Sequence, residues 1–184
     1  AGAGTIVTGT VWSGSVAEGE QVLVLPVGVE ARVRSVEVHG VRAERAEPGR
    51  RAALALVGLS REQAERGAVV VTGDGWRATR VLDVELRMLE GHAEIRPRLR
   101  VRVHHATSEV MARIVPGMRE GDATAARLRL EAPLVARTGD RFVLRSYSPV
   151  TTIGGGIVVD PHADELVRER GRRRPLPALL PDTD

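Results

Sequence analysis

The chain has 184 residues and a formal net charge of +3, and every one of its 27 basic residues is arginine. Because it has no lysine, it cannot contain a phosphate-binding loop of the G-x-x-x-x-G-K-[ST] type. Because it has no cysteine, disulfides, thiol nucleophiles and cysteine-bound zinc are excluded. The modest positive charge allows a nucleic-acid partner without requiring one.

Hydrophobic residues make up 42% of the chain but aromatic residues only 2%, so its cores must consist mainly of Val, Leu, Ile and Ala. The sequence has no run of about 18 apolar residues that would span a membrane. Its first residues lack the charged and apolar pattern of a signal peptide. We therefore expect a cytoplasmic protein with no membrane partner.

Short β-rich segments alternate with turn residues along the chain, which is typical of an all-β sandwich or barrel. The first group of predicted strands covers residues 4–13, 21–27, 31–39, 51–58 and 68–72. The second group covers 78–90, 97–105, 107–115, 122–132, 140–148 and 152–159. The turn-rich sequence Thr72-Gly73-Asp74-Gly75 separates the groups. We predict two domains with separate cores, over 1–74 and 75–162, followed by a linker or tail over 163–184.

Two short helical segments are also predicted. Ser60 to Arg66 has the pattern of a single helical turn, with Ser60 as its cap and Gln63 three residues later. Residues 163–170 favour a short helix before an arginine-rich stretch. That stretch is consistent with a solvated linker or with a contact to RNA.

The clearest period-two alternation runs from Arg98 to Val103. It predicts a strand with apolar side chains on one face and Arg98, Arg100 and Arg102 on the other. Such a row of arginines is either a solvated surface or part of a nucleic-acid contact, and the sequence leaves both open.

The opening Gly4-Thr5-Ile6-Val7-Thr8-Gly9-Thr10 resembles the start of the second domain of translational GTPases of the elongation factor Tu group. Val36-Glu37-Val38-His39 resembles that family's strand with a Glu-x-His pair, and Pro48 to Leu56 resembles the following Gly-led strand. The second half resembles the third domain of the same group through Arg98 to Val110 and Gly139 to Phe142. The resemblance implies two consecutive small β-barrels, of the domain II and domain III types.

Two later motifs resemble bacterial selenocysteine-specific elongation factors more than other members of the group. They are Arg145 to Gly156, which ends in three glycines, and Val159-Asp160-Pro161-His162; His104 to Val110 fits the same factors. The resemblance implies that the barrels hold the acceptor arm and aminoacyl end of selenocysteinyl-tRNA for GTP-dependent delivery to the ribosome. It also implies that the GTPase domain, with GTP and Mg, lies outside this chain. We therefore expect no catalytic residue and no cofactor in this segment. The other implied partners are its own GTPase domain and C-terminal winged-helix domains that bind messenger RNA.

The resemblance places Glu37, His39 and Arg51 at the pocket for the terminal adenosine and the esterified amino acid. Glu37 and His39 are two residues apart, so a strand would present both on one face. Glu37 can accept hydrogen bonds from ribose or base, and His39 can donate one to the aminoacyl group. We expect Arg51 to read the selenolate, whereas Arg50 should point to the opposite face. The alternative is that these are ordinary surface charges.

The resemblance implies tRNA backbone contacts in the second barrel at His104, His105, Thr107 and Ser108. The residues themselves add Arg98, Gly154 and Gly155 as further candidates for the same contact. Hydroxyl and imidazole groups there would bond phosphate or 2′-hydroxyl groups. The glycines would either allow a close approach of RNA or mark a bulge that closes the barrel. A metal site is not expected, because the two adjacent histidines face opposite sides of a strand.

Two other functions stay open at this point. One is a pair of tRNA-binding barrels from another factor like elongation factor Tu, or from an initiation-factor gamma subunit. The other is a protein-interaction scaffold that binds no RNA.

Overall fold

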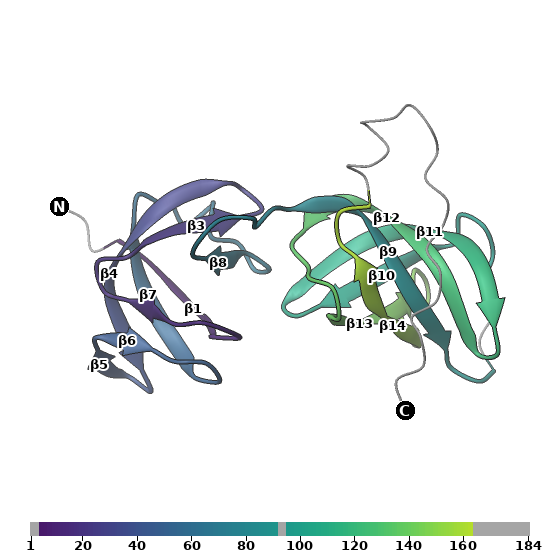
Figure 1. Cartoon of the computed structure of the whole chain (residues 1–184), viewed down its shortest axis with the longest axis horizontal. Helices are drawn as coiled ribbons and strands as arrows, with labels where there is room; N and C mark the ends of the chain where they lie inside the picture. Colours follow the sequence, from purple (N-terminus) through teal and green to yellow (C-terminus); the bar gives the residue numbers. More distant parts are fainter. Residues whose placement is uncertain (1–3, 92–94, 164–184) are drawn as a thin grey trace. The chain divides into compact units, whose positions relative to one another are not determined.

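The computed structural model describes residues 4–91 and 95–163 and divides the chain into two compact units, Ala1–Arg77 and Ala78–Asp184 (Figure 1). The division falls just after the predicted seam at Thr72–Gly75. Each unit has its own cluster of buried aliphatic side chains. The described part of the chain contains strands and turns but no helix, so the all-β prediction is confirmed. The predicted helix over 163–170 lies outside the described residues, except for Ala163, which is in a turn.

From residue 4 onward, the first unit has eight strands: β1 (Thr5–Thr10), β2 (Val16–Ala17), β3 (Gln21–Leu25), β4 (Val29–Val38), β5 (Val41–Ala43), β6 (Arg45–Ala46), β7 (Arg51–Val57) and β8 (Val69–Val71). Five of them form the order β1-β7-β4-β3-β8, with β5 paired to β4, and β2 pairs with β6 in a separate ladder. Among the described residues, hydrogen bonds therefore do not close this unit into a ring. Val16 of β2 and Ala46 of β6 nevertheless belong to the same core cluster as Val33 and Leu56. The small ladder thus completes the enclosure of one core.

The segment Ser60–Arg66 is a hydrogen-bonded turn and not the predicted helical turn. The Ser60 amide donates to Gln63 Oε1 at 2.8 Å, which is one half of the predicted capping box. Gln63 N donates to the carbonyl of Ser60 at 3.2 Å, and Ala64 N donates to that of Arg61 at the same distance. Both hydrogen bonds join residues three apart in the sequence, and the pattern stops there without continuing into a helix.

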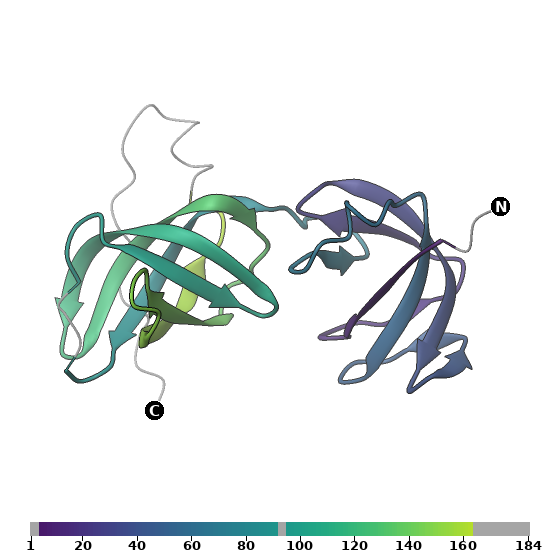
Figure 2. The same ribbon diagram turned by 180° about the vertical axis from the view of Figure 1, so that it is seen from behind.

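The described residues of the second unit, 78–91 and 95–163, form six strands: β9 (Thr79–Met88), β10 (Arg100–His105), β11 (Ser108–Glu120), β12 (Ala123–Leu134), β13 (Arg141–Ser146) and β14 (Thr152–Asp160). They form a closed antiparallel barrel in the order β10-β11-β12-β9-β14-β13 (Figure 2). Leu82, Val103, Ile114 and Leu144 are among the side chains that fill it, each almost fully buried. Every predicted strand of this half is present, with its ends moved by a few residues.

The middle of strand β9, residues 82–86, is buried on both faces, and its outward face holds an ion pair. Asp83 is directly opposite Arg127 of β12. Arg127 Nε and Nη2 donate to the two Asp83 oxygens at 2.7 and 2.9 Å. Asp83 is fully buried and Arg127 is 8% exposed. The hydrogen bonds to Asp83 raise the pKa of Arg127 above its ordinary value, so Arg127 stays charged although it is buried.

Barrel closure depends on the three glycines of β14, which lies between β9 and β13. A Cβ on Gly156 would lie 2.2 Å from the carbonyl oxygen of Glu85. A Cβ on Gly154 would lie 2.5 Å from that of Arg87, and one on Gly155 would lie 2.7 Å from that of Phe142. The neighbouring backbones therefore occupy the space where side chains would be. Of the two alternatives for these glycines, this packing supports a role in closing the barrel, and the contact of Gly154 and Gly155 with tRNA stays a prediction.

We predict that Gly156→Ala destabilises the second barrel by about 3 kcal/mol or more, because a backbone carbonyl cannot move away as a flexible side chain can. Urea denaturation followed by far-UV circular dichroism measures this effect. Trp12 and Trp76 both lie in the first unit, so tryptophan fluorescence should report an unchanged transition there.

The matched control is Gly9→Ala in β1, where a Cβ would have no atom within 4 Å. Its effect should stay below about 0.5 kcal/mol. Equal effects of the two substitutions would show that β14 is not closely packed against its neighbours.

Candidate nucleic-acid interface

The outer face of β1, β7 and β4 brings together two of the three residues predicted for the aminoacyl pocket. Glu37 is opposite Ala53, and Ala53 is opposite Thr8. Arg51 is two residues before Ala53 on β7 and pairs with Thr10. Since residues two apart share a face, Glu37 and Arg51 lie diagonally across the same face, away from the core.

Small side chains occupy the surface beside these two charges. Ala53 is half-buried, and Ala55, two residues further along β7, is 9% exposed. Ile6 of β1 pairs with Ala55 and is 68% exposed. The side chains beside the two charges are therefore small and partly apolar and project little from the sheet. The exposed side chains of Glu37 and Arg51 lie at one end of this face.

Arg51 and Arg50 are both exposed, but they differ in position. Arg51 is the first residue of β7 and lies on the face just described, whereas Arg50 precedes the strand, next to the Pro48–Gly49 turn. The Arg50 carbonyl accepts a hydrogen bond from Val11 N at 2.9 Å. Within the described part of the chain, no protein group forms an ion pair with either guanidinium. Arg51 is therefore accessible to a ligand on this face.

The expectation that Glu37 and His39 lie side by side on a strand is wrong. Strand β4 ends at Val38, and Val38 pairs with Val41, so His39 and Gly40 form a two-residue hairpin turn. Both have positive φ, 54° and 77°, as type I′ turns require. Histidine tolerates this region better than most residues. His39 therefore projects from a turn at the end of the sheet and does not continue the strand's alternation.

The adjacent histidines of β10 have different environments. His105 is 5% exposed, and its Nε2 lies 3.0 Å from Asp140 Oδ2. The same Asp140 oxygen accepts a hydrogen bond from Arg137 N at 2.8 Å. The prediction that His105 contacts tRNA is therefore wrong, because alternation turns it inward with Val101 and Val103. His104 faces outward with a side chain that is 29% exposed.

The remaining predicted contacts lie at the ends of β10. Thr107 is exposed in the turn between β10 and β11, and Ser108 begins β11. Arg98 is also exposed, but it precedes β10 with φ 65°, in a turn. The expectation that Arg98 continues the arginine row is therefore wrong, because a residue in the left-handed region breaks the alternation of the strand.

Arg100 and Arg102 do share the outer face of β10, and each is paired with a carboxylate. Arg100 Nε and Nη2 donate to the two oxygens of Glu131 at 2.9 and 2.7 Å. Arg102 donates to Glu109. The bond to Arg100 lowers the pKa of Glu131, and the bond to Arg102 lowers that of Glu109. Both carboxylates are therefore ionised at neutral pH.

Tyr147 is a member of this cluster to which sequence reasoning gave no role. The guanidinium carbons of Arg100 and Arg102 lie 4.7 and 5.9 Å from its ring centroid, and the residue is 50% exposed. Both distances are within the range of cation–π contacts. The chain has only two Trp, one Tyr and one Phe, so a lone tyrosine just after the arginine-bearing segment 141–145 was a signal that the sequence offered.

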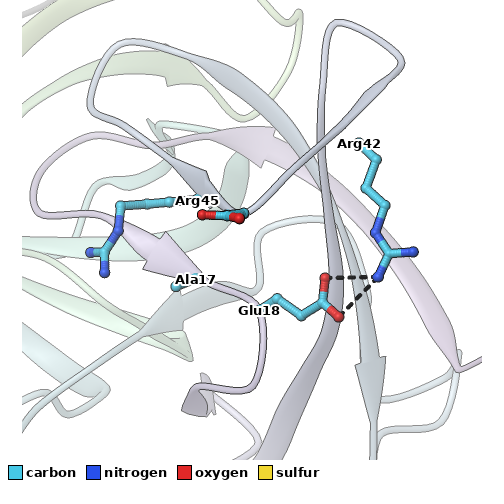
Figure 3. Close-up of a pocket in the computed structure, with 5 residues that line it drawn as sticks. Ala17, Glu18, Arg42 and Arg45 are labelled. Carbon is cyan, nitrogen blue, oxygen red and sulfur yellow. Dashed lines mark hydrogen bonds and ion pairs between the residues drawn. The ribbon is translucent and has the colours of Figure 1, made fainter.

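A polar hollow on the first unit was not expected from the sequence. Ala17, Glu18, Arg42, Glu44 and Arg45 line it (Figure 3). Arg42 Nη2 donates to both Glu18 oxygens at 2.9 and 3.0 Å, so two of the hollow's four charged side chains pair with each other. Among residues 4–91 and 95–163, no group of three or more His, Asp or Glu is placed to hold a metal ion. The same residues include no helix that is long and apolar enough to cross a membrane.

Comparison with protein families matches each unit to a different domain. Residues 4–71 match the family model of elongation factor Tu domain 2. Residues 82–165 match the beta-barrel domain of selenocysteine-specific elongation factor. The two matches correspond to the two structural units.

Similar whole proteins carry the same description. The chain is 34% identical over 165 residues to the selenocysteine-specific elongation factor of Desulfomicrobium baculatum, covering 87% of this chain and 26% of that protein. The Escherichia coli factor is 33% identical over 176 residues, covering 95% and 27%. A solved bacterial selenocysteine-specific elongation factor has a TM-score of 0.76 at 26% identity, covering 91% of this chain and 28% of that structure.

These matches define the chain as the barrel pair of a translation elongation factor of the elongation factor Tu class. Within that class, it belongs to the selenocysteine-specific elongation factors, since its second barrel matches their domain and its relatives carry that name. The chain spans about a quarter of the length of these two relatives.

We predict that His105→Ala destabilises the second barrel by about 2 kcal/mol, because the largely buried side chain of Asp140, 13% exposed, loses a hydrogen-bond partner. RNA affinity of the folded variant should stay within about two-fold of the unsubstituted chain. Urea denaturation and fluorescence anisotropy with a tRNA transcript measure the two quantities. His104→Ala is the matched control, and it should leave stability nearly unchanged. A stable His105→Ala variant with weakened RNA binding would restore His105 as a contact residue.

Proposed function

We propose that the two barrels hold the acceptor arm and aminoacyl end of selenocysteinyl-tRNA. The observation that carries this proposal is the exposed Arg51 on the same outer face as Glu37, in a chain of this family. A selenol ionises more readily than a thiol, so a selenocysteine side chain is largely an anion at neutral pH. A guanidinium offers it a fixed pair of donors. Seryl-tRNA presents no such charge.

The other groups of this face have complementary roles in the proposal. Glu37 accepts hydrogen bonds from the terminal ribose or base. The side chains of Ala53 and Ala55 are small, so a ligand can approach the backbone of β7. His39 reaches the aminoacyl group from its turn and not from the strand.

In the second barrel, His104, Thr107, Ser108 and Arg98 contact the tRNA backbone. They lie in and beside β10, with His104 and Arg98 at opposite ends of it. Such groups recognise the shape of an A-form helix through phosphates and 2′-hydroxyls, without reading sequence.

The complete factor is a translational GTPase in this proposal. GTP and Mg bind its GTPase domain, and the factor acts with the ribosome in the cytoplasm, with winged-helix domains binding messenger RNA. RNA-binding measurements on the present chain separate this function from that of a protein-interaction scaffold, which would bind no RNA.

We predict that, in the complete factor, Arg51→Ala weakens binding of selenocysteinyl-tRNA about ten-fold more than binding of seryl-tRNA. A charge-assisted hydrogen bond contributes about 1.5 kcal/mol at the lower end of its range, which suits an exposed site. The measurement is the ratio of the two dissociation constants at fixed salt.

Arg50→Ala is the matched control, because it removes the same charge from the adjacent residue that lies outside the strand. It should change both affinities little and equally. If Arg51→Ala leaves the ratio unchanged, selectivity for selenocysteine arises elsewhere.

We predict that the 184-residue chain neither binds nor hydrolyses GTP, since the lysine of a phosphate-binding loop is lacking. Calorimetric titration with Mg·GTP should release no binding heat. Micromolar affinity would contradict the assignment of nucleotide chemistry to another domain.

A further inference from the structure

Strand pairing assembles five arginines on one outer face of the second barrel. Arg100 is opposite Arg113, and Arg113 is opposite Arg129, so these three form a row across β10, β11 and β12. Arg102 is opposite Arg145 of β13. We call this set, Arg100, Arg102, Arg113, Arg129 and Arg145, the arginine face.

Two carboxylates lie on the same face. Glu109 of β11 is opposite His104, and Glu131 of β12 follows inward-facing Leu130. Glu131 holds Arg100 and Glu109 holds Arg102, by the hydrogen bonds given above. The two arginines within cation–π distance of Tyr147 are therefore also the two that form ion pairs with these carboxylates.

The loop that presents Tyr147 is fixed by hydrogen bonds. Ser146 N donates to the Thr151 carbonyl at 2.9 Å, and Thr151 N donates to Ser146 Oγ at 3.0 Å. These bonds hold the loop that carries the exposed ring, which lies within cation–π distance of both guanidiniums. An exposed, positioned ring beside cations is suited to packing against ribose or base, with the cations at phosphates.

Three nitrogens on this face lack hydrogen-bond partners within the described part of the chain. They are Arg102 Nε, His104 Nε2 and Arg145 Nε, all buried from solvent. Buried polar nitrogens without a hydrogen-bond partner are unfavourable, and the two arginine Nε groups can only donate. The present arrangement is therefore incompletely satisfied, and an incoming anion that reorients these side chains would supply acceptors.

We propose that Glu109 and Glu131 act as resident counter-anions of an RNA-binding site formed by Arg100, Arg102 and Tyr147. In the free protein they hold the two arginines beside the ring; when RNA binds, its phosphates replace them. This inference rests on the proposed function, because it assumes that the second barrel binds RNA. Exchange is feasible because an exposed ion pair is weak, while a guanidinium binds phosphate through two parallel hydrogen bonds.

The exchange lowers RNA affinity by the free energy of the two ion pairs. Before RNA binds, the two carboxylates hold the arginine side chains in place, so these side chains lose less conformational freedom on binding. Removing a carboxylate should therefore strengthen RNA binding, although the substitution removes a contact from the protein.

The test measures the affinity of the 184-residue chain for a fluorescein-labelled, unmodified tRNA transcript by anisotropy at fixed salt. Glu109→Gln and Glu131→Gln should each tighten binding about two- to five-fold, the range that corresponds to breaking an exposed ion pair. Tyr147→Leu should weaken binding, because it removes the ring that the cations flank. Circular dichroism confirms that each variant is folded.

Glu120→Gln is the matched control. Glu120 is exposed at the far end of β11, so this variant has the same change in net charge at a distance where salt screens it. If Glu109→Gln and Glu131→Gln bind no tighter than Glu120→Gln, or bind more weakly, the exchange is overturned and the carboxylates only support the arginines. If the unsubstituted chain and all variants fail to bind the transcript, the proposed function of the barrel fails instead.

Discussion

The close approach of β14 to its two neighbours is the constraint on which the second barrel depends. Gly154, Gly155 and Gly156 lie where carbonyl oxygens of β9 and β13 occupy the Cβ positions. Without this approach β13 would not be joined to β9 through β14, and the ring of strands would stay open. Closure also places β13 beside β10, so Arg145 meets Arg102 and the following loop presents Tyr147 next to Arg100. The glycines therefore shape the arginine face without lying in it.

The two candidate faces differ in whether their arginines form ion pairs within the protein. In the first unit, Arg51 has no ion-pair partner in the described part of the chain and projects beside small side chains. In the second barrel, Arg100 and Arg102 are held by carboxylates and by an aromatic ring. An unpaired cation suits discrimination of one small anionic group, because no internal competitor must be displaced. A neutralised cluster suits a long polyanion, for which moderate affinity at each phosphate is sufficient.

Burial separates residues that the sequence presents as equivalent. His104 and His105 are neighbours, yet one faces solvent and the other bonds Asp140 inside the barrel. Arg127 and Arg129 belong to one alternating stretch and share the outward side of β12. Arg127 is nevertheless buried with Asp83, whereas Arg129 is exposed in the arginine row. The difference arises from what lies opposite each residue, since only Arg127 faces an acidic partner on β9.

The sequence alone determined the positions of the longer strands and the family, because these depend on local alternation and contiguous motifs. It also placed Glu37 and Arg51 correctly on one face, as the register of β4, β7 and β1 shows. It did not predict the short strands β2, β5 and β6. It failed where the backbone leaves the strand, at His39 and Arg98, whose positive φ values no local pattern announced. Only the tertiary structure decided which residues meet across strands: Arg100 with Glu131, Arg102 with Arg145, and the β14 glycines with neighbouring carbonyls. Alternation fixes a side chain's face relative to its own strand, whereas its partners depend on a register set by contacts between distant segments.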